Sequence, residues 1–161
     1  MMQVRSINEN DIPKWQALSA EYDCYVKELV ADLIEWYDGN DTSLDFISYM
    51  KAKISQGEAF MAVDSGDKCL GVIAFSKKNN RITFFGVAHS SDFQIVGNAL
   101  FKNVLKQLNN SKSMYINEIS STSEWIQLHK KLYCTWGFCF HGNNIENGVP
   151  VKTFEKAPSV V

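Results

Sequence analysis

The sequence predicts an α/β fold of the α+β kind, in which helices pack against a mixed sheet. Apolar residues recur every three to four positions before residue 57 and over 92–108, whereas short apolar runs separated by turns fill 59–87. The 161 residues are 45% hydrophobic and 21% charged, which suits one domain with a core that needs no disulfide or metal. We expect a single domain over 1–156 and a frayed tail over 157–161.

The first third of the chain is predicted as a strand followed by helices. Residues 2–7 alternate, and Asn10-Asp11-Ile12-Pro13 provides an N-cap candidate with proline early in a helix. The helical period then predicts helices over about 11–24, 26–37 and 41–57. Thr42, with Asp45 three residues later, resembles a capping box at the start of the third.

The middle of the chain changes to strands. Residues 59–63, 69–75 and 81–87 are apolar runs separated by Ser65-Gly66-Asp67 and by residues 77–80, both typical of turns. We expect an antiparallel meander, with the third strand central and covered on both faces because it shows little alternation. Beyond it we expect a helix over 92–108, a strand over 113–119, a helix over 123–136, and strands over 137–140 and 149–154.

Composition excludes several classes of function. The formal net charge is −2 and only Arg5 and Arg81 are arginines, so a nucleic-acid partner is not expected, and an anion site has to rely on lysines or backbone amides. Residues 1–45 hold ten acidic and three basic residues, a net charge of −7, and the remainder carries +5. No apolar run reaches the roughly 18 residues of a membrane span, so we expect a cytoplasmic protein with no membrane partner.

The cysteines and histidines do not predict a metal site. The four cysteines contain no C-x-x-C pair and are typical of reduced, mostly buried thiols. His129, Cys134, Cys139 and His141 cluster in the sequence, but their spacing matches no common zinc framework. We expect no metal.

Two short segments carry a family resemblance. Gln94-Ile95-Val96-Gly97-Asn98-Ala99, where a strand hands over to the long helix, resembles the Q/R-x-x-G-x-G/A signature through which the Gcn5-related N-acetyltransferase (GNAT) superfamily binds acetyl-CoA. Leu132-Tyr133-Cys134-Thr135-Trp136-Gly137-Phe138 is similar to the L-Y-x-x-x-G-F that closes the last helix of that superfamily. With the helical stretches before residue 57 written as two helices, the element order is β-α-α-β-β-β-α-β-α-β-β. Motifs and order together indicate a GNAT-like acyl-CoA N-acyltransferase fold.

The resemblance implies acetyl transfer from acetyl-CoA, as co-substrate, to a primary amine by direct attack. Tyr133 would be the general acid near the CoA sulfur. Glu118, the only acid in its strand, is the candidate base, and His89 is an alternative with a pKa suited to neutral pH. The backbone of Val87, Ala88 and His89 would pair with the pantetheine arm, and Gln94, Ile95, Val96, Gly97, Asn98 and Ala99 would cradle the pyrophosphate.

The acceptor would lie against the first helices, where acids alternate with aromatics. Tyr22, Tyr25 and Glu28 suit a small cationic molecule or a peptide amine by charge and by cation–π contact. Two alternatives stay open: a catalytically degenerate, CoA-binding regulatory module, and an interaction domain with no CoA site. A homodimer is also left open.

Overall fold

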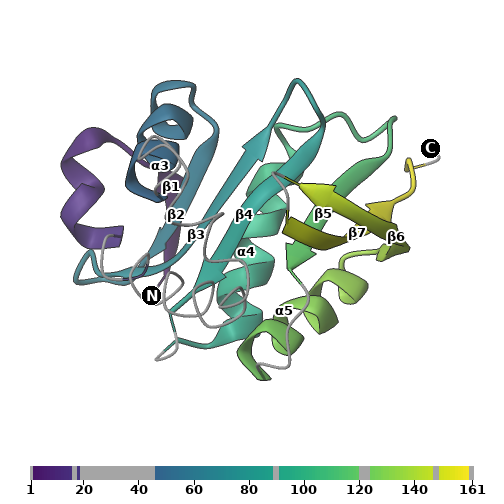
Figure 1. The fold of residues 1–161 in the computed structure, drawn as a ribbon. Coiled ribbons are helices and arrows are strands. Elements are labelled where there is room, and N and C mark those ends of the chain that lie inside the picture. The colour runs from purple at the N-terminus through teal and green to yellow at the C-terminus, as the bar shows by residue number, and fades with distance from the viewer. Residues whose placement is uncertain are drawn as a thin grey trace.

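The computed structural model describes residues 2–15, 18, 46–88, 91–119, 124–146 and 149–159. These form a seven-stranded sheet in the order β1-β2-β3-β4-β5-β7-β6 (Figure 1). The strands are β1 (Gln3–Ser6), β2 (Ala59–Val63), β3 (Cys69–Ser76), β4 (Arg81–Val87), β5 (Met114–Ile119), β6 (Phe138–Glu146) and β7 (Val149–Lys156). The helices are the 3-10 turn η1 (Glu9–Asp11), α3 (Phe46–Ser55), α4 (Phe93–Leu105) and α5 (Glu124–Thr135).

The expected meander is confirmed. β2, β3 and β4 pair antiparallel in sequence order, and β1 adds a further antiparallel strand beside β2. The two turns between them use Asp67 and Asn80, which adopt positive φ angles of 64° and 51°, a conformation that Asp and Asn tolerate better than most residues. β4 then pairs parallel with β5, as a connection through a helix allows. The predicted mixed sheet is therefore confirmed, with β4 at its centre.

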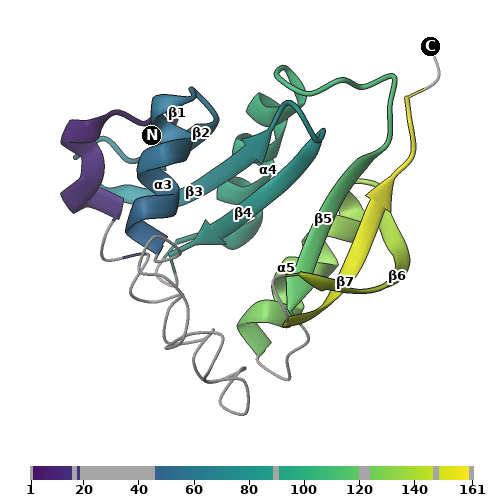
Figure 2. The ribbon, with the colours of Figure 1, turned by 45° about the horizontal axis from the view of Figure 1, so that its top comes forward.

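Helices cover both faces of the sheet (Figure 1 and Figure 2). Because neighbouring strand residues point to opposite faces, β2 sends Ala62 into a core with α4 and α5, and Met61 into a second core with Met50 of α3. The sheet is therefore packed on both faces, by α4 and α5 on one side and by α3 on the other. Among the described residues, no helix is long and apolar enough to cross a membrane.

The start of the first predicted helix differs in detail. Asn8, not Asn10, is the N-cap: its side chain accepts from Asn10 N at 2.9 Å, and its own N–H donates to Asp11 at 3.0 Å. Arg5 donates two hydrogen bonds to the same carboxylate, at 2.7 and 2.8 Å, and holds the pKa of Asp11 far below its usual range. The box begins a 3-10 turn that leads into helical residues 12–15.

The C-terminal hairpin is longer than expected. β6 runs to Glu146 instead of ending near residue 140, and the sequence hides this because β6 is an edge strand whose outer residues are polar. Phe140 and Ile145 are 55% and 75% exposed on it. The expected frayed tail is described as far as Ser159, whose amide donates to Asn110 O at 2.8 Å.

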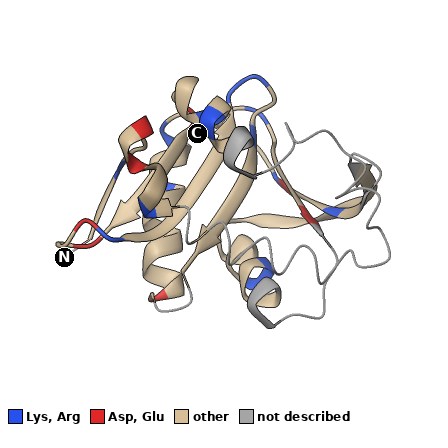
Figure 3. Ribbon diagram, turned by 60° about the vertical axis from the view of Figure 1, so that its left-hand side comes forward, with Lys and Arg blue, Asp and Glu red and all other residues tan. Residues whose placement is uncertain are grey.

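The charge asymmetry of the sequence lies mostly outside the described residues. Of the ten acids in residues 1–45, the structure describes Glu9 and Asp11. On the described ribbon, basic and acidic segments are interspersed (Figure 3).

Candidate active site

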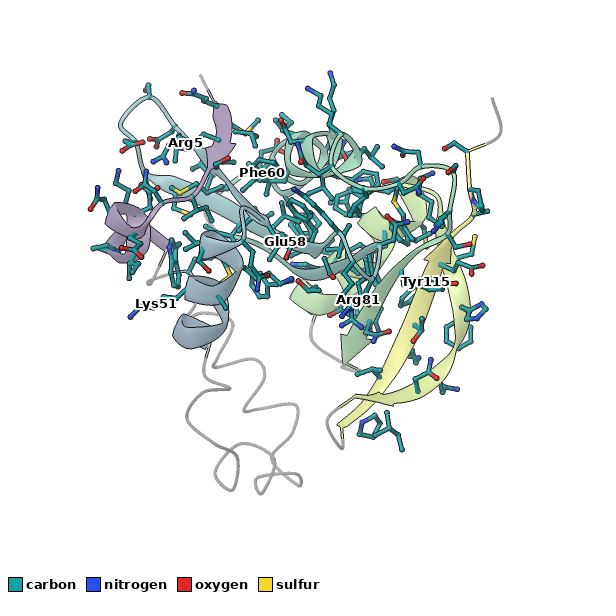
Figure 4. The ribbon with its side chains drawn as sticks, turned by 90° about the horizontal axis from the view of Figure 1, so that it is seen from above. Arg5, Lys51, Glu58, Phe60, Arg81 and Tyr115 are labelled. Carbon is teal, nitrogen blue, oxygen red and sulfur yellow. The ribbon has the colours of Figure 1, made fainter. Side chains whose placement is uncertain are left out.

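The central parallel strands separate soon after they meet. β4 and β5 pair only at Arg81–Tyr115 and Ile82–Ile116, although β4 continues to Val87 and β5 to Ile119. Arg81 and Tyr115 mark the closed end (Figure 4). Beyond it the facing strand edges do not pair with each other. Strand edges consist of hydrogen-bonding groups, and beyond this end the backbones of β4 and β5 do not form one continuous ladder.

A single asparagine ties the closed end together. Asn80, in the turn between β3 and β4, donates from Nδ2 to the carbonyl oxygens of Asn109 and Ser113 at 3.0 and 2.9 Å. Its Oδ1 accepts from Asn109 N at 2.8 Å. The turn before β4 is therefore bound to the loop before β5, which fixes where the two strands meet.

The predicted catalytic pair is brought together. Met114, Ile116 and Glu118 alternate on one face of β5, and the first two are buried in the core with α5. Tyr133 projects from α5 onto this face, is 2% exposed, and is hydrogen-bonded to Glu118. A carboxylate can only accept, so the tyrosine hydroxyl donates when Glu118 is ionised.

The environment of Glu118 suits proton transfer at neutral pH. Burial raises the pKa of its carboxyl to about 7, while the hydrogen bond from Tyr133 and the charge of Lys130 act in the opposite direction. A carboxyl with this pKa is about half ionised at pH 7, so it can both take and release a proton there.

The structure narrows the expected pyrophosphate site. Residues 94–99 lie inside α4, which starts at Phe93 with Asp92 as N-cap. Val96 N already donates to Asp92 O, and Ile95 N donates to the Asp92 carboxylate, both at 3.0 Å. Since only the first turn of a helix offers amides to a ligand, the amides of Gly97, Asn98 and Ala99 serve the helix itself. Any contact by helix amides falls to the start of α4.

Gly97 and Asn98 also join α4 to α5. A Cβ atom at Gly97 would lie 2.5 Å from Leu132 Cδ2 and 3.0 Å from Phe85 Cζ, so any larger residue at this position would require the Leu132 side chain to shift. Trp136 Nε1 donates to Asn98 Oδ1 at 2.8 Å, and the Trp136 ring stacks on Phe101 at 4.3 Å between centroids. The sequence signal for the hydrogen bond to Asn98 was Trp136 itself, because the N–H of a buried tryptophan usually bonds to an acceptor.

Sequence reasoning missed the role of His129. It is 1% exposed, and its ring lies 4.8 Å from that of Phe93 and 5.2 Å from that of Phe85. It thus fills the space between α4, α5 and β4, one helical turn before Tyr133. Within the described ranges, no three His, Cys, Asp or Glu side chains are placed to hold a metal ion.

The thiols are less buried than expected. Cys69 is buried, and burial raises its pKa to about 11. Cys134 and Cys139 are exposed, because they lie on the outer surfaces of α5 and β6. The expectation of mostly buried thiols is wrong for these two.

The structure constrains the predicted pantetheine contacts only in part. Ala88 N donates to Leu70 O at 2.9 Å, and Ala88 O accepts from Ser91 N at 3.0 Å, so both backbone groups of Ala88 are engaged. Because alternate strand residues bond to opposite edges, Val87 points its backbone toward β5. His89, Tyr22, Tyr25 and Glu28 lie outside the described residues.

The mixed seven-stranded sheet and its strand order are consistent with the GNAT-like acyl-CoA N-acyltransferase fold that the sequence motifs predict. The family model of the acetyltransferase (GNAT) domain matches residues 34–157. The chain therefore belongs to the GNAT acetyltransferase family.

Solved structures agree on the fold. The chain is similar to PaiA N-acetyltransferase from Thermoplasma acidophilum in complex with coenzyme A (TM-score 0.68, 10% identity, 98% of this chain and 99% of that chain). It is also similar to an N-acetyltransferase from Staphylococcus aureus Mu50 (TM-score 0.64, 14% identity, 99% of each chain). A third is the ribosomal-protein-S18-alanine N-acetyltransferase from Escherichia coli (TM-score 0.61, 14% identity, 100% and 96%). A comparison with curated proteins finds no match.

Proposed function

We propose that the protein is an N-acetyltransferase that moves an acetyl group from acetyl-CoA to a primary amine of a small cationic molecule or peptide by direct attack. The observation that supports this most is the Glu118 carboxyl, with a pKa of about 7 and a hydrogen bond from Tyr133, beside the parting of β4 and β5. A module that only bound CoA would have no need for a carboxyl poised to exchange protons at neutral pH.

The two side chains divide the proton transfers. Acetyl-CoA would supply the acyl group as a thioester. The acceptor amine must be neutral to attack the acyl carbon, so an alkylamine, whose free pKa is near 10, first releases one proton to solvent. As the neutral amine attacks, ionised Glu118 accepts a second proton from its nitrogen. As the new C–N bond forms and the C–S bond breaks, Tyr133 donates its hydroxyl proton to the departing sulfur. Glu118 then returns its proton to Tyr133 through their hydrogen bond, which restores both groups.

The proposed class of acceptor amine is based on how charge is distributed along the sequence. Residues 1–45 carry −7 and the remainder +5, so a cationic amine is favoured near the N-terminal region and an anionic co-substrate elsewhere. Acids interleaved with aromatics in residues 21–37 also suit a cation.

One observation favours the second candidate, a CoA-binding regulatory module without turnover. Asp92 caps α4 with a carboxylate, at the helix end where an anion would otherwise bind. This negative charge opposes a pyrophosphate and points to a cofactor contact altered from that of an ordinary acetyltransferase.

Calorimetric titration with acetyl-CoA, followed by thiol release over a panel of polyamines, amino sugars and peptide amines at pH 8, separates these candidates. We expect binding, and thiol release with at least one amine that Glu118→Gln lowers at least tenfold. Glu155→Gln is the matched control, because Glu155 pairs with Tyr115 on the opposite face of β5 and β7. Binding without thiol release over any amine would support the regulatory module. No binding at all would exclude both candidates.

A further inference from the structure

Besides Tyr133, two lysines lie near Glu118. Lys152 of β7 is its register partner across the antiparallel pair, and directly opposed residues project from the same face of a sheet. From α5, Lys130 interacts electrostatically with both Glu118 and Lys152. Lys130 precedes Tyr133 by three residues, which places the two side chains on one face of the helix. Helix and strand thus bring one acid, one tyrosine and two lysines together.

The burial of Lys130 shows that it faces inward. It is partly buried, whereas the next residue, Lys131, is exposed. Burial lowers the pKa of Lys130, nearby Lys152 lowers it further, and Glu118 raises it. A lysine that is partly desolvated beside a second lysine is unfavourable unless an anion compensates its charge. Glu118 is the anion that α5 and β5 supply here.

We propose that Lys130 is a positioning residue for the acid–tyrosine pair, whose ammonium group keeps the Glu118 carboxyl ionised and able to accept a proton. The inference rests on the proposed function and deepens it. Burial raises the pKa of Glu118, and the charge of Lys130 acts with the Tyr133 hydrogen bond to lower it, so loss of this charge would shift the carboxyl further towards its protonated form. Once Glu118 has taken a proton, Lys130 and Lys152 are no longer compensated, and their repulsion favours passing that proton on to Tyr133.

The effect of Lys130 on the titration midpoint of Glu118 can be measured without turnover. We would titrate the ¹³C-labelled glutamate carboxyls of the protein alone by NMR and assign Glu118 by its loss in Glu118→Gln. In Lys130→Met the midpoint of Glu118 should rise by about one pH unit or less, the size expected for one partly screened charge. Lys131→Met, the same change at the adjacent exposed position, should leave the midpoint unchanged, and Lys130→Arg should restore it. An identical midpoint in wild type and Lys130→Met overturns the proposal.

Kinetics then distinguish this inference from the proposed function. If the wild type turns over, the rise of kcat/KM with pH should move upward in Lys130→Met by the NMR shift, while the plateau at high pH stays within about twofold. A uniform loss at every pH, without a change in midpoint, would indicate a purely structural role and reject the inference. If the wild type shows no turnover, the proposed function fails while the NMR titration still decides the role of Lys130. Lys130→Gln replaces Lys130→Met should the latter not fold.

Discussion

The side chain of Tyr133 both packs in the core and hydrogen-bonds to Glu118. Its ring packs in the aromatic core, 5.7 Å from Trp136 and 6.2 Å from Phe154 between centroids, and its hydroxyl bonds to Glu118. Phenylalanine keeps the first interaction and removes the second, so Tyr133→Phe separates packing from chemistry.

We predict that Tyr133→Phe lowers kcat by tenfold or more, with acetyl-CoA affinity changed less than threefold, because only the departing sulfur needs the proton. The free energy of unfolding should fall by about 1 kcal/mol or less, the usual contribution of one hydrogen bond. Thiol release, calorimetry and urea unfolding measure the three quantities. Turnover at the wild-type level would mean that Tyr133 has no acid role.

Glu118 should make stability depend on pH. Its folded-state pKa of about 7 lies above the ordinary glutamate value of 4.5. Between these pH values the folded state therefore binds more protons, and the free energy of unfolding falls as pH rises. Glu118→Gln has no charge to bury. We predict that it is close to wild type at pH 5 and more stable by about 1 to 3 kcal/mol at pH 8. Urea unfolding at both pH values tests this, and equal differences at pH 5 and pH 8 would contradict it.

The sequence predicted Glu118 and Tyr133 better than it predicted the residues around them. Tyr133 was identified by its motif, and Glu118 as the only acid of a strand beside the parting. Lys130 and His129 were not assigned their roles, since the inward face of a helix depends on how it docks, which periodicity alone does not give. Asn98 pairs with a residue 38 positions away, a contact that local patterns do not contain.

At the scale of elements, the packing of α4 on α5 explains the motif glycine. Periodicity and turn composition correctly predicted α4, α5 and the meander, because local residues determine both. They did not predict β6 beyond residue 140, where pairing with β7 stabilises a polar strand. The function of Gly97 was likewise set by the facing helix, through Leu132.

We predict that Gly97→Ala destabilises the protein by about 1 to 3 kcal/mol, the usual effect of overpacking, because its new methyl group would overlap Leu132 and Phe85. Gly142→Ala is the control, since a Cβ at Gly142 meets nothing within 4 Å, and it should lie within about 1 kcal/mol of wild type. Thermal and urea unfolding compare them. Equal stability of both variants would show that α4 and α5 are not in close contact at Gly97.

For the whole molecule, the parting of β4 and β5 is the feature that joins fold to function, and Asn80 holds its closed end. Asn80 is 8% exposed, makes three hydrogen bonds to Asn109 and Ser113, and has a positive φ of 51°. Alanine would remove the hydrogen bonds and strain the backbone, whereas glycine would remove only the hydrogen bonds.

We therefore predict that Asn80→Ala lowers the free energy of unfolding by about 2 to 4 kcal/mol, and Asn80→Gly by about 1 kcal/mol less than that. Asn79→Ala, at the exposed neighbour, should change it little. Because the closed end loosens, amide hydrogens near Ile82 and Ile116 should exchange faster in both Asn80 variants, and KM for acetyl-CoA should rise. Unchanged amide exchange in β4 and β5 would show that the loops hold this end of the two strands together without Asn80. The packing of α4 and α5 would then set the point where the strands separate.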